Sequence, residues 1–135
     1  MSITVYRKAH FNAAHRLYRK DWDDEKNKSV FGKCSNPNFH GHNYELEVGI
    51  SGTIDTETGF LIDIEKLKSI IKEEIEDYLD HKNLNIEIPD FKNINPTMEN
   101  IAIVIWDRLR NKIESKFKVS VKLFETPRNF VVYTG

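Results

Sequence analysis

Alternation of apolar and polar side chains over Ile3–Leu17 constrains this chain more than any other feature of its sequence. Every second side chain of a β-strand lies on the same face, so the pattern predicts a strand and not a helix. Its apolar face is interrupted once, by Arg7, and reaches His15 near its end. A second strand is predicted from His40 to about Gly52, where the even-numbered positions form one apolar face. Two such strands require a sheet whose apolar face is covered by other elements.

Two amphipathic helices are predicted next. Asp63 is a suitable N-cap for the first, and the apolar residues after it recur at helical spacing as far as Leu79. The second helix is capped by Thr97 or a neighbour, with Glu99 in its first turn and a stripe of apolar residues as far as Ile113. Both helices therefore have an apolar side that can cover a sheet.

The rest of the sequence predicts a strand pair, Lys118–Glu125 and Asn129–Tyr133, and two loops. The polar stretch Tyr18–Ser29 predicts a long exposed loop, and Asp80–Pro96 predicts another. The order of strands and helices, β-β-α-α-β-β, predicts an α+β fold in which an antiparallel sheet carries two helices on one face. No repeat or linker-like run divides residues 1–135, so we expect a single domain.

Composition excludes several classes of protein. The 20 Lys and Arg residues nearly balance the 21 Asp and Glu residues, so bulk charge indicates no nucleic-acid or membrane partner. No apolar stretch approaches the roughly 20 residues of a membrane-spanning helix. The N-terminal residues lack the apolar core of a signal peptide, so we expect a cytoplasmic protein. Cys34 is the only cysteine and therefore cannot form an internal disulfide.

Three histidines lie in phase with the apolar strand faces. His40 and His42 are two residues apart in a predicted strand, so both imidazoles can reach one ion, and Gly41 leaves room between them. His15, on the face of the other strand, could complete a set of three nitrogen ligands, which is typical of catalytic zinc. The alternative is a chance His-Gly-His tripeptide with ordinary surface imidazoles. His10 lies on the opposite face and is interpreted as ordinary.

Two further positions are candidates for acid–base chemistry. Cys34 follows Lys33 in a loop shortly before His40, where a thiol near a dication would be a competent base or nucleophile. It could equally be an unreactive side chain or a fourth metal ligand. Asp80 and His81 follow the first helix directly, and a carboxylate beside an imidazole can fix its tautomer. The alternative is a histidine favoured by the helix dipole.

Charged side chains suggest two possible ligand contacts. Glu125, at the end of a strand, either pairs with Arg128 or accepts two N–H donors from a guanine-like ring. Arg16, Arg19 and Lys20 form a short cationic cluster near His15. This cluster is either a solvated surface or a place that holds a phosphate-bearing substrate.

Together these residues resemble the 6-pyruvoyltetrahydropterin synthase family. The resemblance runs in order over essentially the whole chain and lies in separate motifs: FNAAHRL (11–17), FGKCSNPNFHGHNY (31–44), LDHKNL (79–84), PTMEN (96–100), ETP (125–127) and VVY (131–133). It implies the T-fold, a four-stranded antiparallel sheet with two helices on one face. It also implies a homo-oligomer, a hexamer built as a dimer of trimers, with active sites between subunits.

The resemblance implies a site and a reaction. The reaction is the zinc-dependent conversion of 7,8-dihydroneopterin triphosphate to 6-pyruvoyltetrahydropterin, in which a lyase eliminates triphosphate. The implied residues are His15, His40 and His42 for zinc, Cys34, Asp80 and His81 for catalysis, and Glu125, Thr97 and Glu99 for the substrate.

Two alternatives remain open at this point. One is 6-carboxytetrahydropterin synthase of queuosine biosynthesis, which uses the same substrate. The spacing between Cys34 and His40 resembles the pyruvoyl enzymes, whereas Phe39 and Met98 depart from their pattern. The other is a non-catalytic, zinc-stabilised pterin-binding module.

Overall fold

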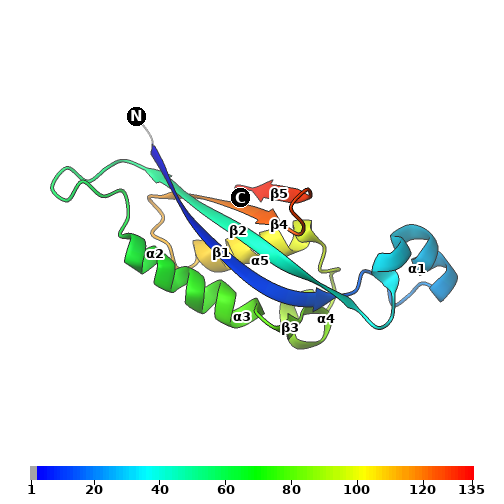
Figure 1. The fold of residues 1–135 in the computed structure, drawn as a ribbon. Helices are drawn as coiled ribbons and strands as arrows, with labels where there is room; N and C mark the ends of the chain where they lie inside the picture. The colour runs from blue at the N-terminus through cyan, green and yellow to red at the C-terminus, as the bar shows by residue number, and fades with distance from the viewer. Residues whose placement is uncertain (1–2) are drawn as a thin grey trace.

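A mixed five-stranded sheet organises this computed structural model, which describes residues 3–135. Its strands are β1 (Ile3–His15), β2 (His40–Gly52), β3 (Lys82–Asn83), β4 (Lys118–Phe124) and β5 (Phe130–Tyr133). They lie in the order β3-β1-β2-β4-β5 (Figure 1). Neighbouring strands are antiparallel except β3, which runs parallel to β1. The four longer strands form the predicted antiparallel sheet, and β3 adds a short edge that was not predicted.

Two helices cover one face of the sheet. The first consists of α2 (Ile64–Ile71), η2 (Lys72–Glu76) and α3 (Asp77–Leu79), and the second is α5 (Met98–Arg110). Asp63 caps α2 by accepting a hydrogen bond from the Glu65 backbone N–H, and Thr97 caps α5 by accepting one from Asn100. Both caps are as predicted. The shorter elements are α1 (Asp24–Phe31), η1 (Gly32–Ser35), α4 (Leu84–Glu87) and η3 (Pro89–Phe91).

The turn η2 is π-helical and lies inside the first long helix. Leu67, Ile71, Ile75 and Leu79 are all buried, at intervals of four residues. In a regular α-helix each such interval rotates the side chain by about 40°, so the apolar stripe would drift away from the sheet. A wider π turn offsets this drift. The helix therefore remains packed along its whole length and delivers Asp80 to the sheet edge.

The core between sheet and helices is built from the alternating side chains that the sequence predicts. Phe11 on β1 and Tyr44 on β2 are buried, and their rings stack with centroids 4.8 Å apart. The register pairs Phe11 with Tyr44 and, farther along, His15 with His40. The apolar faces of both strands thus lead to histidines at the same end of the sheet.

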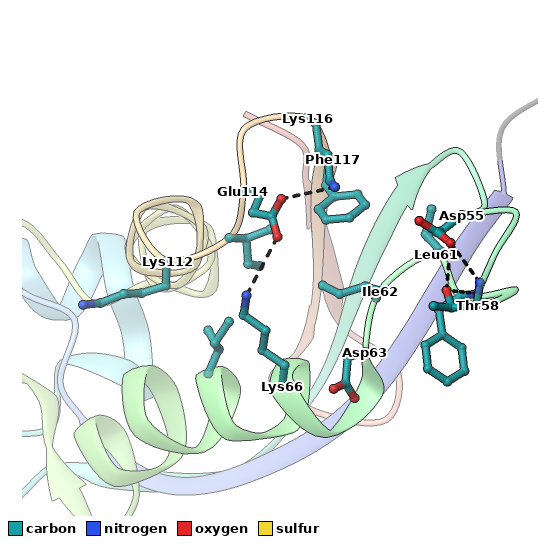
Figure 2. Close-up of a pocket in the computed structure, with 13 residues that line it drawn as sticks. Asp55, Thr58, Leu61, Ile62, Asp63, Lys66, Lys112, Glu114, Lys116 and Phe117 are labelled. Carbon is teal, nitrogen blue, oxygen red and sulfur yellow. Dashed lines mark hydrogen bonds and ion pairs between the residues drawn. The ribbon is translucent and has the colours of Figure 1, made fainter.

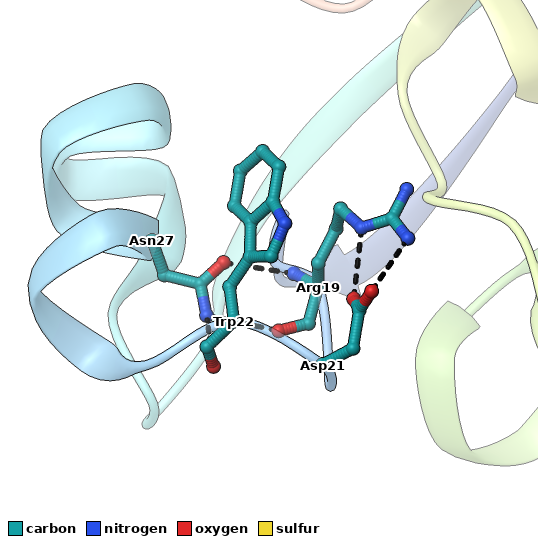
Figure 3. A network of polar contacts seen from close by, with 4 residues as sticks. All are labelled: Arg19, Asp21, Trp22 and Asn27. Atoms are coloured by element: carbon teal, nitrogen blue, oxygen red, sulfur yellow. Dashed lines mark hydrogen bonds and ion pairs between the residues drawn. The ribbon is translucent and has the colours of Figure 1, made fainter.

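The stretch Tyr18–Ser29, predicted as a loop, contains most of a helix instead. Helix α1 projects beyond the end of the sheet (Figure 1), and Asp23 caps its first turn. Asn27 is buried and forms hydrogen bonds to the backbone of the preceding turn (Figure 3). Its Oδ1 accepts from the Arg19 N–H at 2.8 Å, and its Nδ2 donates to the Arg19 and Trp22 carbonyls. This helix could not be predicted from the sequence, because polar contacts stabilise it and no apolar stripe marks it.

Other predicted boundaries shift for local reasons. Strand β1 ends at His15 and not at Leu17, because the Arg16 N–H donates to Asn85 Oδ1 and the Leu17 N–H to the Cys34 carbonyl, each at 2.8 Å. The predicted loop before Pro96 contains β3, α4 and η3. Within residues 3–135, no helix is both long and apolar enough to cross a lipid bilayer.

Candidate metal and active site

Three imidazoles meet at the end of β1 and the beginning of β2. His15 lies opposite His40 in the register, and His42 lies two residues along β2 on the same face. The His15 ring centroid is 4.5 Å from that of His40 and 5.1 Å from that of His42. One ring nitrogen from each residue lies within 4.8 Å of the others. The predicted convergence of these histidines is therefore present in the fold.

His15 is held in one orientation by its surroundings. It is 1% exposed, and its Nδ1 lies 2.7 Å from the Pro96 carbonyl, which can only accept a hydrogen bond. Nδ1 therefore carries the proton, and the lone pair of Nε2 is directed to the other histidines. Burial lowers the pKa of His15 to about 4, so the ring is neutral at pH 7. A neutral ring with an available lone pair is the form that binds a metal.

The unpartnered nitrogens of this cluster fit a cation. His15 Nε2, His40 Nδ1 and His42 Nε2 are buried, and none has a hydrogen-bond partner within the described residues. Leaving such groups unpaired costs free energy, and a cation between them would satisfy all three. Three imidazole ligands suit zinc and leave a fourth position for water or substrate. Cys34 is outside this group, which argues against its being a fourth ligand.

A carboxylate lies beside the histidines. Glu125, just after β4, places Oε1 3.9 Å from Nε2 of His42. Burial raises the pKa of Glu125, and the negative charge of Glu99 raises it further, whereas His42 lowers it. Glu125 forms no ion pair with Arg128 within residues 3–135, so the predicted alternative pairing is absent there. Its carboxylate thus lies next to the candidate metal site.

The beginning of α5 connects the remaining predicted substrate residues to this site. Thr97 accepts a hydrogen bond from the Asn100 N–H at 3.2 Å, so its side chain is the helix cap. Glu99, in the first turn, is close enough to affect the pKa of Glu125. Pro96, the residue before the cap, holds His15. Capping at Thr97 therefore fixes the Pro96 carbonyl on which the orientation of His15 depends.

Asp80 and His81 form a contact pair at the sheet edge. Nδ1 of His81 lies 2.9 Å from Oδ2 of Asp80. The Asn12 N–H donates to Oδ1 of Asp80 at 2.8 Å, and this bond, followed by the His81 side chain, lowers the pKa of the carboxyl. His81 has a left-handed backbone (φ 60°), and its side chain is 82% exposed. Neither residue belongs to the three-histidine group, so the chain pairs them but leaves them facing solvent.

Cys34 lies in η1, half-buried, as a free thiol. Its carbonyl accepts from the Leu17 N–H at 2.8 Å, and the next carbonyl, of Ser35, accepts from Nε of Arg16 at 2.7 Å. Within the described part of the chain, the Cys34 thiol forms no hydrogen bond. The segment that carries Cys34 is thus tied to the residues directly after His15.

Three residues were not identified by sequence reasoning. The Pro96 carbonyl and the Asn12 backbone position two predicted site residues, and backbone groups leave no signal in the sequence. Tyr44 places its hydroxyl 3.4 Å from Nδ1 of His15, and burial raises the pKa of this phenol. Its signal was available, because Tyr44 continues the period-2 pattern of His40 and His42.

A small hollow at the other end of the molecule is separate from this site. It has a volume of about 230 Å³ and lies between the loop after β2 and the loop before β4 (Figure 2). Lys66 and Lys116 both pair with Glu114 there. The 13 residues of β2 separate this hollow from His40, which corresponds to roughly 40 Å. The hollow therefore contributes nothing to the histidine cluster.

The chain is similar to known proteins over its whole described length. The 6-pyruvoyl tetrahydropterin synthase family matches residues 4–135. The 6-pyruvoyl tetrahydrobiopterin synthases of Pongo abelii and Homo sapiens are 47% and 45% identical over 131 residues, covering 97% of this chain and 90% of each relative. The structure of Caenorhabditis elegans 6-pyruvoyl tetrahydropterin synthase matches with a TM-score of 0.94 at 37% identity, covering 100% of this chain and 96% of that one. The similarity includes both the sheet and the elements around its histidine end.

Proposed function

The chain belongs to the 6-pyruvoyl tetrahydropterin synthase family, and we propose that it converts 7,8-dihydroneopterin triphosphate to 6-pyruvoyltetrahydropterin with release of triphosphate. It is a lyase with the T-fold of that family. The single observation that carries the proposed reaction is the cluster of His15, His40 and His42, whose buried nitrogens have no partner within residues 3–135.

The three histidines are the proposed zinc ligands. Bound there, zinc would act as a Lewis acid toward the hydroxyl oxygens of the substrate side chain and so acidify the adjacent carbon-bound hydrogens. The chain's own contribution is to hold a ligand in the tautomer and protonation state that bind a metal. The Pro96 carbonyl holds the His15 tautomer, and burial keeps that ring neutral.

Cys34 is the proposed base. Its thiolate would remove a proton from the substrate side chain, and the electron pair left behind would expel triphosphate by breaking the carbon–oxygen bond. Asp80 and His81 would handle the protons that move during the later tautomerisation. Their contact at 2.9 Å is the geometry in which a carboxylate orients an imidazole. Oxidation of the side chain and reduction of the ring occur within one molecule, so this reaction requires no external redox cofactor.

Glu125 is the proposed anchor for the pterin ring. A carboxylate accepts two parallel N–H donors, and a pterin offers such a pair. Burial raises the pKa of Glu125 because it removes water from the charged carboxylate, and a poorly solvated carboxylate accepts a stronger hydrogen bond from a bound ring. Thr97 and Glu99, at the beginning of α5, are the proposed neighbours of the ring.

The assembly and location of the protein are further proposals. The exposure of the Asp80–His81 pair supports a homo-oligomer, a hexamer formed as a dimer of trimers, in which this pair serves a neighbouring subunit. A base thiol must remain reduced, which supports the cytoplasm as its location. That residues 1–135 form one domain also remains a prediction.

Product identification tests the proposed reaction. The zinc-loaded protein is incubated with 7,8-dihydroneopterin triphosphate, and the products are separated and identified by mass spectrometry. We expect 6-pyruvoyltetrahydropterin and one equivalent of released triphosphate. Formation of 6-carboxytetrahydropterin with acetaldehyde would instead support the queuosine-type enzyme. Tight zinc binding without turnover would support the non-catalytic module.

A further inference from the structure

The cationic residues near His15 in the sequence line two separate hollows. The first, here the Arg16 hollow, has a volume of about 760 Å³, and the second, the Lys92 hollow, about 590 Å³. Arg16, Lys28 and Lys33 line the Arg16 hollow, whereas Arg19, Lys20 and Lys92 line the Lys92 hollow. The sequence placed Arg16, Arg19 and Lys20 in one cluster, and the fold separates them. The two hollows can therefore be compared as sites for an anion.

The guanidinium of the Lys92 hollow is already paired, whereas Lys20 and Lys92 form no ion pair within residues 3–135. Nε and Nη2 of Arg19 donate to the two carboxylate oxygens of Asp21, each at 2.8 Å (Figure 3). This bidentate pair occupies the face of the guanidinium that would otherwise bind phosphate. Much of the remaining wall is formed by asparagine amides. A polyanion would have to displace Asp21 in order to use Arg19.

The cations of the Arg16 hollow are not paired in this way. Within residues 3–135, no carboxylate lies within 4.0 Å of the cationic nitrogens of Arg16, Lys28 or Lys33. Asp24 is the one carboxylate in the described lining, so the hollow has an excess of positive charge, as the Lys92 hollow also has. The two differ in their guanidinium groups, because in the described chain only that of Arg19 is paired with a carboxylate. The volume of the Arg16 hollow lies within the range of about 300–1,000 Å³ that is common for ligand pockets.

The Arg16 guanidinium is held in place by two contacts. Its Nε donates to the Ser35 carbonyl at 2.7 Å, and its guanidinium stacks on the Tyr18 ring at 3.9 Å. In the described residues its two terminal nitrogens have no hydrogen-bond partner. The two contacts reduce the entropy lost when a phosphate binds, because the planar group is held before the ligand arrives.

Sequence neighbours of the proposed site residues also line the Arg16 hollow. Arg16 follows His15 directly, and Ser35 follows Cys34. Ser35, Asn36 and Pro37 line the hollow on the segment that leads to His40. An anion bound here would contact the segments that carry the proposed catalytic residues. Those residues are proposed to act on the substrate side chain, to which the leaving group is attached.

We propose that the Arg16 hollow binds the triphosphate group of the substrate through Arg16, Lys28 and Lys33. This inference rests on the proposed function, since it assumes a substrate with a polyphosphate tail. Lys28 and Lys33 supply charge, and Arg16 supplies directed N–H donors. The Lys92 hollow has no part in triphosphate binding.

Matched double variants test the assignment of the hollow. Lys28→Gln/Lys33→Gln removes two exposed lysines from the Arg16 hollow, and Lys20→Gln/Lys92→Gln removes two exposed lysines from the Lys92 hollow. Both variants lose the same charge and keep the histidines, so long-range charge and metal effects are equal. Arg16 remains unchanged, because its bond to Ser35 also supports the Cys34 segment. Circular dichroism and zinc content should match the unmodified protein in both variants.

Binding of inorganic tripolyphosphate is measured first, by calorimetry on the zinc-loaded full chain freed of excess zinc. Lys28→Gln/Lys33→Gln should raise the dissociation constant about tenfold or more, and the control pair should change it less than about twofold. Binding of dihydroneopterin without phosphates should be unchanged in both. Equal losses in the two variants, no loss in the first, or no binding by the unmodified protein would overturn the inference.

Kinetics then separate this inference from the proposed function. With 7,8-dihydroneopterin triphosphate, Lys28→Gln/Lys33→Gln should raise KM about tenfold and leave kcat within about twofold. If the unmodified protein turns over the substrate and this variant has an unchanged KM, the assignment of the Arg16 hollow as the triphosphate site is wrong, whereas the proposed reaction stands. If tripolyphosphate binding follows the predicted pattern but no turnover occurs, the Arg16 hollow is supported as a polyphosphate site and the proposed reaction is contradicted.

Discussion

At the scale of single residues, unpartnered ring nitrogens are the feature on which the proposed chemistry rests. His15 gives one nitrogen to the Pro96 carbonyl and turns the other toward His40 and His42. No other polar group of the described chain satisfies that second nitrogen. Because this arrangement costs free energy until a ligand binds, it favours a bound cation.

Replacing Cys34 with alanine should abolish turnover and leave zinc bound. Loss of a general base lowers kcat by about 10²–10⁴-fold, whereas the three histidines retain the metal. Zinc per chain and the rate of triphosphate release are the two measurements. His10→Ala, on the opposite face of β1, is the control and should change neither. If Cys34→Ala loses zinc, Cys34 is a ligand and its assignment as base is wrong.

Asp80→Asn should make stability less dependent on pH. The hydrogen bond from Asn12 and the contact with His81 lower the Asp80 pKa, so the ionised carboxylate stabilises the folded state. This contribution is present above the unfolded pKa of about 3.9 and is lost as pH falls through the lower folded pKa. Because Asp80 is 41% exposed, solvent screening limits the effect to less than about 1 kcal/mol.

Urea unfolding at pH 7 and at pH 3 measures this difference in stability. The variant should be less stable than the unmodified protein at pH 7, and the difference should be smaller at pH 3. An equal difference at both pH values would show that the carboxylate charge is not the cause.

At the scale of elements, α1 illustrates how polar contacts can order a segment that composition marks as a loop. Asn27 is buried and binds the backbone of the preceding turn at three points. The Trp22 ring stacks on the Phe31 ring with centroids 5.8 Å apart, and the Lys26 ammonium lies over the Trp22 ring. Together these contacts hold α1 beyond the end of the sheet.

Asn27→Ala should open this segment to proteases. Removing its hydrogen bonds frees the turn around Arg19, so trypsin should cut there about tenfold faster. Limited proteolysis followed by mass spectrometry gives the rate and the position of cleavage. Ser29→Ala, an exposed change on the same helix, is the control. Equal cleavage of both variants would mean that Asn27 does not order the turn.

Elements marked by periodicity were predictable, and those stabilised by tertiary contacts were not. The alternation in β1 and β2 and the caps at Asp63 and Thr97 all follow from local sequence. Strand β3 has only two residues, too few for a pattern, and exists because it pairs with β1. The π turn η2 was also not predictable, because its sequence is compatible with an ordinary α-helix.

At the scale of the whole molecule, the sheet leaves apolar side chains uncovered. Tyr6 and Val132 are 57% and 54% exposed, on strands β1 and β5. β5 is also an edge strand, whose free backbone groups can pair with another chain. These features support the proposed homo-oligomer, with this edge of the sheet at a contact between subunits.

Val132→Lys should therefore shift the protein to smaller assemblies. A buried lysine at an interface is costly, so light scattering should report a lower mass than six chains. Turnover should fall with it, because the exposed Asp80–His81 pair would lose the neighbouring site, while zinc remains bound. Ile103→Lys, at an exposed apolar position on α5, is the control and should keep the full mass. A full-size Val132→Lys assembly would contradict the role of this edge.

The candidate site was predictable where one strand phase determines it. His15, His40, His42 and Glu125 converge because their strands are in register, and the period-2 pattern contains that information. How Cys34 and the Asp80–His81 pair relate to these residues depends on loops and, in the proposed homo-oligomer, on other copies of the chain. The separation of Arg16 from Arg19 likewise depends on the turn that Asn27 orders.

A zinc titration followed by turnover tests the central claim most directly. Metal-free protein receives increasing zinc, and the release of triphosphate from 7,8-dihydroneopterin triphosphate is measured at each step. The rate should rise linearly and reach its plateau at one zinc per chain, and His42→Ala should show neither binding nor activity. Full activity without zinc, or one bound zinc per chain with no turnover, would contradict the assignment of the three histidines to a catalytic metal.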